Sequence, residues 1–217
     1  MRVLITAGPT YEPLDPVRFL GNRSTGKMGY ALAEAFAARG AAVTLVSGPV
    51  VLPAPASPLI TTWRVETAQQ MFEAAAAAAP AADVWVFAAA VADYRPAEVA
   101  AEKIKKADDT LTLTLVKNVD IAATLGQAKR AEQFAVGFAL ETTNELAHAQ
   151  AKLWRKNLDL VVLNSLRDAG AGFGHDTNQV TVLDRAGQTL TFELQAKTTL
   201  AHALADLILT RFSLLHA

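Results

Sequence analysis

The most constraining feature of this sequence is a series of short apolar runs in which polar and apolar residues do not alternate. Such runs occupy residues 3–6, 43–47, 60–65 and 84–90. Segments with helical periodicity separate them, notably residues 28–39 and 67–79, where Thr67 is a suitable N-cap. Unbroken apolar strands separated by helices are typical of a parallel sheet covered on both faces. The pattern predicts an α/β, Rossmann-like, doubly wound fold.

The second half of the chain adds an arm and a hairpin to this plan. Residues 110–118, TLTLTLVKN, alternate strictly and predict a half-exposed strand that protrudes as an arm. The βα rhythm then resumes, followed by a C-terminal hairpin that turns near Gly187. These later elements are a strand at 134–139, a helix at 144–156, a strand at 160–163, the hairpin at 179–194 and a helix at 197–215. No linker divides the chain, so residues 1–217 are expected to form a single domain.

Composition excludes several classes of protein. A formal net charge of −1 gives no general affinity for polyanions, so nucleic acid is not an expected partner. The absence of cysteine removes disulfides, a thiol nucleophile and thiolate metal sites. The least polar stretch, residues 74–92, is mostly alanine and is interrupted by Pro80 and Asp83, so no membrane span is predicted. The start of the chain shows no signal-peptide pattern, and a cytoplasmic protein is expected.

The stretch GNRSTGKM, residues 21–28, nearly matches a P-loop. It ends in methionine where that motif has serine or threonine, and it lies well beyond the first strand. Gly26 and Gly29 would let backbone N–H groups converge on an anion at the start of the following helix. The same glycines would equally serve tight turns and close helix–sheet packing. This segment alone therefore leaves phosphate binding open.

Several other polar residues are candidates for ligand binding. Asp93 follows the strand at 84–90, where open sheets bind ligands, and it would contact a ribose or base or simply serve a turn. Lys103 begins the run KIKK, and Lys152 and Lys156 share one face of a helix, although each group also suits a solvated surface. The four histidines show no metal-ligand spacing. This set suits phosphate-based activation, in which positioning and charge neutralisation do most of the catalysis.

Taken in order, seven segments resemble those of one family, phosphopantothenoylcysteine synthetase, the ligase of coenzyme A biosynthesis. They are ITAGPTYEPLDPVRFLGNRSTGKMGYALA, AAAVADYRP, EKIKK, LVKNVDIAATL, VGFALET, KLWRKNLDLVVLNS and GAGFGHDTNQVTVL. The resemblance covers nearly the whole chain. It implies a Rossmann-like homodimer with exchanged arm strands, which joins 4′-phosphopantothenate to L-cysteine. The KIKK and AAAVADYRP segments are similar to the bacterial type, which uses CTP with Mg²⁺ and forms an acyl-cytidylate.

The resemblance also assigns roles to individual residues. Lys103 matches a lysine associated with forming the acyl-cytidylate, Asn22 an asparagine associated with handling it, and Arg18 a phosphopantothenate ligand. Val119 departs from a frequent proline, and Thr25 from a frequent serine. The positions that match nucleotide contacts are Gly8, Ser24, Gly26, Gly29, Ala89, Asp93, Lys103, Val119, Asp120, Ile121, Ala122, Phe138, Lys152 and Lys156. No metal ligand is assigned.

Two other functions fit a Rossmann-like sheet. An NAD(P) oxidoreductase is disfavoured because the first strand is not followed by G-x-G-x-x-G and no Tyr-x-x-x-Lys pair occurs. A non-catalytic module would bind CTP without releasing pyrophosphate. In many bacteria the synthetase is fused to a flavin-dependent decarboxylase, which this sequence does not contain. The chain is therefore expected to be either a stand-alone synthetase or one half of such a fusion, without decarboxylase activity of its own. A flavin-dependent decarboxylase partner or fused domain is possible outside this chain.

Overall fold

The central element is a mixed sheet of eight strands in the order β12-β11-β10-β9-β6-β1-β4-β5. The computed structural model describes residues 1–217 except 106–109, 142, 166–171, 173 and 216–217. Neighbouring strands from β10 to β5 are parallel, whereas β11 and β12 form an antiparallel hairpin at one edge. The strands are β1 (Arg2–Ala7), β4 (Ala42–Ser47), β5 (Ile60–Arg64), β6 (Val84–Phe87), β9 (Phe134–Glu141), β10 (Leu160–Ser165), β11 (Thr177–Asp184) and β12 (Thr189–Ala196).

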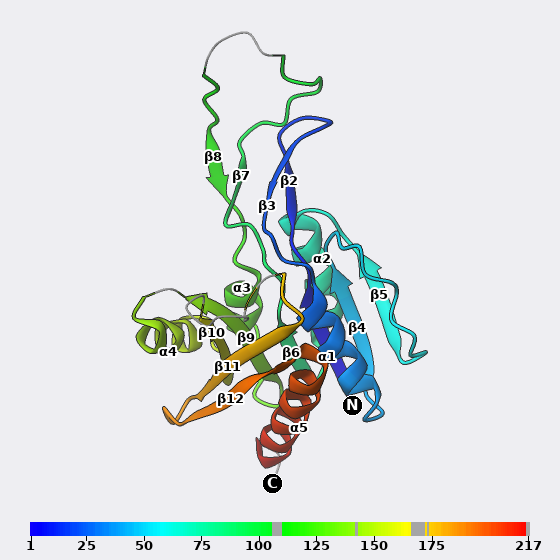
Figure 1. Ribbon diagram of the computed structural model, residues 1–217, viewed down its shortest axis with the longest axis vertical. Helices are drawn as coiled ribbons and strands as arrows, with labels where there is room; N and C mark the ends of the chain where they lie inside the picture. Colours follow the sequence, from blue (N-terminus) through cyan, green and yellow to red (C-terminus); the bar gives the residue numbers. More distant parts are fainter. Residues whose placement is uncertain (106–109, 142, 166–171, 173, 216–217) are drawn as a thin grey trace.

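Helices cover both faces of the sheet, which confirms the doubly wound fold (Figure 1). Helices α1 (Lys27–Ala37) and α5 (Lys197–Leu215) pack on one face, against alternate strand residues such as Ile5 and Val86. Leu4 and Trp85 point to the other face, under three further helices. These are α2 (Ala68–Ala78), which continues into a 3₁₀ turn (Ala79–Ala81), α3 (Ile121–Gln127) and α4 (Glu145–Arg155).

Most expected elements form close to their predicted bounds, and the cap of α2 shows why. The Thr67 hydroxyl accepts a hydrogen bond from the N–H of Gln70, whose side chain in turn accepts one from the N–H of Thr67. This reciprocal capping box satisfies two of the N–H groups that a helix start leaves unpaired. The alanine-rich run that follows is therefore helical, as the sequence predicts.

Two strands are shorter than expected. The strand predicted at 84–90 ends at Phe87, because the chain then bends toward the loop after β1 and exchanges backbone hydrogen bonds between Ala90 and both Gly8 and Thr10. In the predicted arm strand at 110–118, only β8 (Leu115–Lys117) forms. Its partner is β7 (Tyr94–Pro96), and the pairing extends by one backbone hydrogen bond beyond the strands, from the N–H of Ala97 to the carbonyl of Thr114.

A second protrusion was not foreseen from the sequence. Within the predicted loop before residue 27, β2 (Tyr11–Pro13) and β3 (Phe19–Gly21) form a small hairpin whose Tyr11 and Phe19 rings stack at 3.8 Å. This hairpin and the arm, defined here as β7, β8 and the described residues between them, project together from one end of the sheet (Figure 1). Helix α3 was also missed, because seven residues are too few to show a clear helical period.

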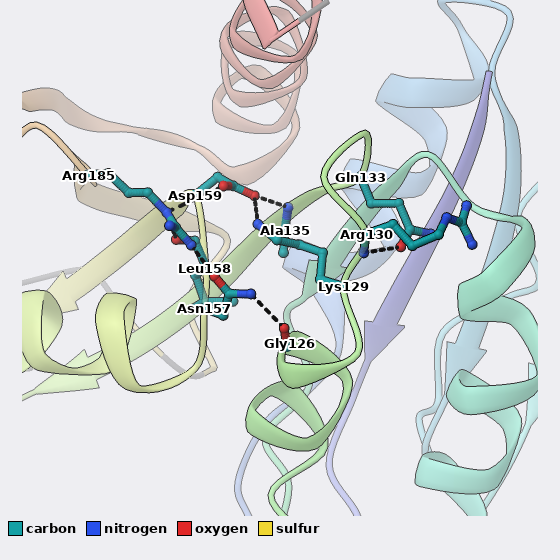
Figure 2. A network of polar contacts seen from close by, with 9 residues as sticks. All are labelled: Gly126, Lys129, Arg130, Gln133, Ala135, Asn157, Leu158, Asp159 and Arg185. Carbon is teal, nitrogen blue, oxygen red and sulfur yellow. Dashed lines mark hydrogen bonds and ion pairs between the residues drawn. The ribbon is translucent and has the colours of Figure 1, made fainter.

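A buried polar network ties together the chain segments before β9 and β10 (Figure 2). The Asp159 carboxylate pairs with the Lys129 ammonium and accepts a hydrogen bond from the N–H of Ala135 at 2.7 Å. The Arg185 guanidinium lies 3.4 Å from the same carboxylate and donates to the carbonyl of Leu158. The Lys129 side chain is only 7% exposed, and burial lowers its pKa. This ammonium therefore depends on Asp159 for its charge balance.

We predict that Asp159→Asn destabilises the protein strongly. The substitution leaves the Lys129 ammonium buried without a counter-ion, a change that typically costs about 3–5 kcal/mol. Urea unfolding would measure the loss. The matched control is Asp206→Asn, which breaks a pair between Arg39 and a 67% exposed carboxylate and should cost less than about 1 kcal/mol. Equal losses in the two variants would contradict the prediction.

Candidate functional site

The candidate site lies where the strand order reverses, between β1 and β6. From β1 the chain builds the sheet outward through β4 and β5, then crosses back to place β6 on the other side of β1. The loops leaving the carboxyl ends of β1 and β6 stay side by side, since Ala90 exchanges backbone hydrogen bonds with Gly8 and Thr10. Ligands of open α/β sheets bind at the carboxyl ends of the strands, near such a reversal point. Two adjoining cavities occupy this position, and residues 89, 91–93 and 138–139 line both of them.

The first cavity, which we name the cradle cavity, opens at the start of α1. Its volume is about 570 Å³, and residues 20–22 and 24–29 form one wall. Gly26, the N-cap, has φ of 77°, and no side chain caps the helix. Gly29 packs so tightly that an added Cβ would lie 2.5 Å from the Cβ of Ala7. The helix start, with its unpaired N–H groups and positive dipole end, thus borders a cavity large enough for an anionic ligand.

Two lysines add positive charge to the cradle cavity. Lys27 pairs with Asp176 at 2.5 Å, and Lys197 donates to the carbonyls of Gly172 and His175 at 2.9 and 2.6 Å. Lys197 is 7% exposed, and both burial and the neighbouring Lys27 lower its pKa. The carbonyl of Asp176 accepts the backbone N–H of Lys197. These contacts fix both cations in the lining of the cavity.

The second cavity, which we name the lysine cavity, lies between α3, α4 and the ends of β6 and β9. Residues 118–122 line it together with Lys152 and Lys156. Lys156 pairs with Asp120 at 2.9 Å, and Lys152 pairs with Glu141 at 2.6 Å. Burial alone would raise the pKa of Glu141, but Lys152 and His148 outweigh it and lower that pKa. Both ammonium groups are therefore held by carboxylates at the cavity wall.

Asn22 and Asn118 brace the loops around the two cavities. The Asn22 side-chain amide donates to the carbonyl of Ala90 at 3.0 Å, which ties the loop before α1 to the loop after β6. The side-chain amide of Asn118 donates to the carbonyl of Ala92 at 2.8 Å, and the backbone N–H of Asn118 donates to the carbonyl of Asp93. The base of the arm is thereby fixed to the loop that separates the cavities.

Most of the residues predicted for the site do line these cavities. The cradle cavity contains Asn22 and three of the predicted loop positions, the lysine cavity contains six predicted residues, and three more line both. Those in the cradle are Ser24, Gly26 and Gly29; those in the lysine cavity are Val119, Asp120, Ile121, Ala122, Lys152 and Lys156; those lining both are Ala89, Asp93 and Phe138. Gly8 lies behind the wall, with its Cα 3.4 Å from where a Cβ on Gly26 would stand.

Arg18 and Lys103 line neither cavity of the chain. Arg18 sits in the β2–β3 turn and donates to the carbonyl of Ile104, which places it beside the exposed Lys103 on the arm. Lys106, the last lysine of KIKK, lies outside the described residues. Lys27, Asn164, Asn178 and Lys197 were not singled out from the sequence. Lys197 in particular opens a helix with no pattern that distinguishes it from a surface lysine.

The protein has a Rossmann-like α/β fold, and a helix N-terminus and several lysines line its crevice. A protein of this class is suited to a polyanionic ligand. The family model described as the DNA/pantothenate metabolism flavoprotein C-terminal domain matches residues 1–212. The chain belongs to this family. The match confirms the family resemblance drawn from the ordered sequence motifs.

Individual relatives give the same placement. Among curated proteins, a protein named cysteine/cysteine sulfinic acid decarboxylase from an unknown prokaryote is 49% identical over 215 residues, 99% of this chain and 59% of its own. The coenzyme A biosynthesis bifunctional protein CoaBC of Escherichia coli (strain K12) is 46% identical over 98% of this chain and 52% of its own. The chain thus spans just over half the length of these relatives.

A solved structure supports the fold over almost all of the chain. The crystal structure of the C-terminal domain of the coenzyme A biosynthesis bifunctional protein CoaBC is 42% identical, with a TM-score of 0.81. The alignment covers 98% of this chain and 97% of that one. Its agreement with this structure confirms the mostly parallel, Rossmann-like sheet.

No helix within the described ranges is both long and apolar enough to cross a membrane. Among the residues that the structure describes, no group of three or more histidine, aspartate or glutamate side chains could hold a metal ion.

We predict that Gly26→Ala weakens binding of a nucleoside triphosphate by on the order of tenfold, the effect of losing about one charge-assisted hydrogen bond. A Cβ at residue 26 would lie 2.7 Å from Cγ1 of Val50 and would displace the first turn of α1. Titration calorimetry would measure the change. The matched control is Gly187→Ala, which has the same φ of 77° but no atom within 4 Å of the added Cβ. A similar loss of affinity in the control would contradict the prediction.

Proposed function

We propose that residues 1–217 form a single phosphopantothenate–cysteine ligase domain that acts in the cytoplasm and uses CTP. The observation that carries the proposal is the joined crevice, in which an uncapped helix start and the Lys152–Lys156 pair flank Asn22 and Asp93. Family membership and the names of the CoaBC relatives support a role in coenzyme A biosynthesis. Because those relatives are bifunctional and about twice as long, we propose that a flavin-dependent decarboxylase domain or partner supplies the other activity.

In the proposed first half-reaction, the carboxylate of 4′-phosphopantothenate attacks the α-phosphorus of CTP. An O–P bond to the acyl oxygen forms, the bond to the β-phosphate breaks, and pyrophosphate leaves with the electron pair. The N–H groups at the start of α1 and the Lys103 ammonium would offset the negative charge that develops on the phosphates. Lys152 and Lys156 would exchange their present carboxylate partners for the nucleotide.

In the proposed second half-reaction, the amine of L-cysteine attacks the acyl carbon and CMP leaves. Asn22 is the residue assigned to this step. One N–H of its amide is donated to the carbonyl of Ala90, and the amide nitrogen has a second N–H. That second donor would hold the acyl oxygen as it becomes negatively charged, which is the action of an oxyanion hole.

Mg²⁺ fits this site as a companion of the nucleotide. Two carboxylates line the cavities, Asp93 and Asp120, and Asp120 is already engaged with Lys156. Mg²⁺ prefers one or two carboxylates together with substrate phosphates and water over an all-protein cage. We therefore propose Asp93 as the residue that would help to hold it, with the ion neutralising phosphate charge.

We further propose that the active unit is a homodimer in which the arms cross. Lys103 lies on the arm and outside both cavities of its own chain, so a second copy would have to bring it to a crevice. The arm and the β2–β3 hairpin also expose large apolar side chains that a partner would cover. These are Val17, Phe19, Tyr94, Val99, Leu111, Leu113, Leu115 and Val116.

The first test measures pyrophosphate release with CTP and, separately, with ATP. We expect release from CTP that requires 4′-phosphopantothenate and accelerates when L-cysteine is added. Release with ATP but not with CTP would show that the nucleotide co-substrate is ATP. A folded protein that binds CTP but releases no pyrophosphate would support a non-catalytic module and overturn the ligase proposal.

Two variants should separate the half-reactions. Asn22→Asp replaces a donor with a carboxylate that faces the carbonyl of Ala90, so amide formation should fall by about 10²–10³ while cytidylate formation persists. Lys103→Gln should instead suppress the burst of pyrophosphate in single-turnover experiments. Equal loss of both steps in Asn22→Asp, or a normal burst in Lys103→Gln, would contradict these roles.

Mixing the same two variants tests the crossed arms. After subunit exchange, a mixed dimer would hold one crevice with both native residues, Asn22 from one chain and Lys103 from the other. Activity should return to about a quarter of the wild-type rate, since half of randomly assorted dimers are mixed and each has one intact site. If Lys103 serves its own chain, no mixed dimer has an intact site and the mixture stays inactive.

A further inference from the structure

The turn of the β2–β3 hairpin contains a carboxylate, that of Asp15, whose side chain is fully buried. Its Oδ1 accepts hydrogen bonds from the backbone N–H groups of Val17 and Arg18, both at 2.8 Å. Its Oδ2 accepts from Nε and Nη2 of Arg18, at 2.9 and 2.5 Å, and from the N–H of Ile104 at 3.1 Å. Five donors from two distant chain segments thus converge on one side chain.

Arg18 completes the link from hairpin to arm. Its Nη2 also donates to the carbonyl of Ile104 at 2.8 Å, so the Asp15–Arg18 pair holds both polar backbone groups of that residue. Four residues earlier, the N–H of Ala100 donates to the carbonyl of Leu14 at 3.0 Å. The hairpin turn is therefore hydrogen-bonded to the arm at Ala100 and at Ile104, and Lys103 lies between these two residues in the chain.

The charge of Asp15 gives this link its strength. The Arg18 guanidinium, chiefly, and the N–H groups of Val17, Ile104 and Arg18 hold the pKa of the Asp15 carboxyl well below its usual range, against the opposing effect of burial. The carboxylate is therefore ionised wherever the enzyme would work. Hydrogen bonds to an ionised acceptor are about twice as strong as neutral ones.

We propose that Asp15 is a positioning residue, which orients Arg18 and fixes the backbone that carries Lys103. Nε and Nη2 of Arg18 donate to Asp15, and Nη2 also donates to Ile104, while Nη1 makes no hydrogen bond among the described residues. Its free donors therefore point away from the pair and remain available to an anionic substrate. The inference rests on the proposed function for what Arg18 and Lys103 contact, but the link itself is independent of it.

The test is Asp15→Asn, which keeps the size of the side chain but removes the charge and turns one acceptor into a donor. Hydrogen exchange at the Ile104 amide, followed by NMR or mass spectrometry, should accelerate by on the order of tenfold or more because its charged acceptor is lost. In steady-state assays, KM for 4′-phosphopantothenate should also rise on the order of tenfold. Simple partial unfolding would lower the amount of active enzyme and leave KM unchanged.

Asp184→Asn is the matched control. Asp184 is also a hairpin carboxylate, since it accepts from the N–H groups of Ala186 and Gln188 and pairs with Arg211, but it lies at the far edge of the sheet. Exchange at Ile104 and KM should both stay at wild-type values in this variant. Thermal melts of both variants would confirm that each is folded under assay conditions.

The outcomes separate this inference from the proposed function. Unchanged Ile104 exchange in Asp15→Asn, or faster exchange with an unchanged KM, would overturn the positioning role. If the wild-type protein shows no turnover, the proposed function is overturned. Faster Ile104 exchange in Asp15→Asn, but not in Asp184→Asn, would still support the link between hairpin and arm.

Discussion

The reversal of strand order between β1 and β6 is the constraint on which the rest of the structure depends. Parallel strands need a crossover connection, here α1 between β1 and β4 and α2 between β5 and β6, and the reversal at β1 places these two helices on opposite faces. The loops after the two strands stay hydrogen-bonded to each other through Ala90, and the loop after β6 borders both cavities of the crevice. Close packing of Gly29 on Ala7 brings the start of α1 to the edge of the crevice. The strand order therefore positions both the crevice and the positive end of the α1 dipole beside it.

The crevice holds its cations in place before any ligand arrives. Lys27, Lys152 and Lys156 each pair with a carboxylate, and the ammonium of Lys197 is anchored on two backbone carbonyls. Such pairing limits the conformations of long side chains, which reduces the entropy lost on binding. The cost is that a ligand must compete with those carboxylates. A polyanion, which can replace several of these partners at once, suits such a site better than a single charge.

The two protrusions carry the candidate residues that the crevice does not contain. The β2–β3 hairpin holds Arg18 and the arm holds Lys103, and the Asp15–Arg18 pair joins them far from the sheet. Three-residue strands are too short to be stable alone, so each protrusion relies on polar links to the other. Their exposed apolar side chains are a physical reason for the homodimer that we propose.

The sequence by itself determined the order of the eight sheet strands and of helices α1, α2, α4 and α5, the cap at Thr67, the turn at Gly187 and the family, because each rests on local periodicity, capping chemistry or ordered motifs. Only the tertiary structure decided where β6 ends, that residues 11–21 form a hairpin, and that Asp15 meets Ile104. Elements of three residues have no measurable period, and a contact across 89 positions leaves no trace in either segment alone. The position of Lys197 was equally hidden, since its burial depends on loop carbonyls brought together only by folding.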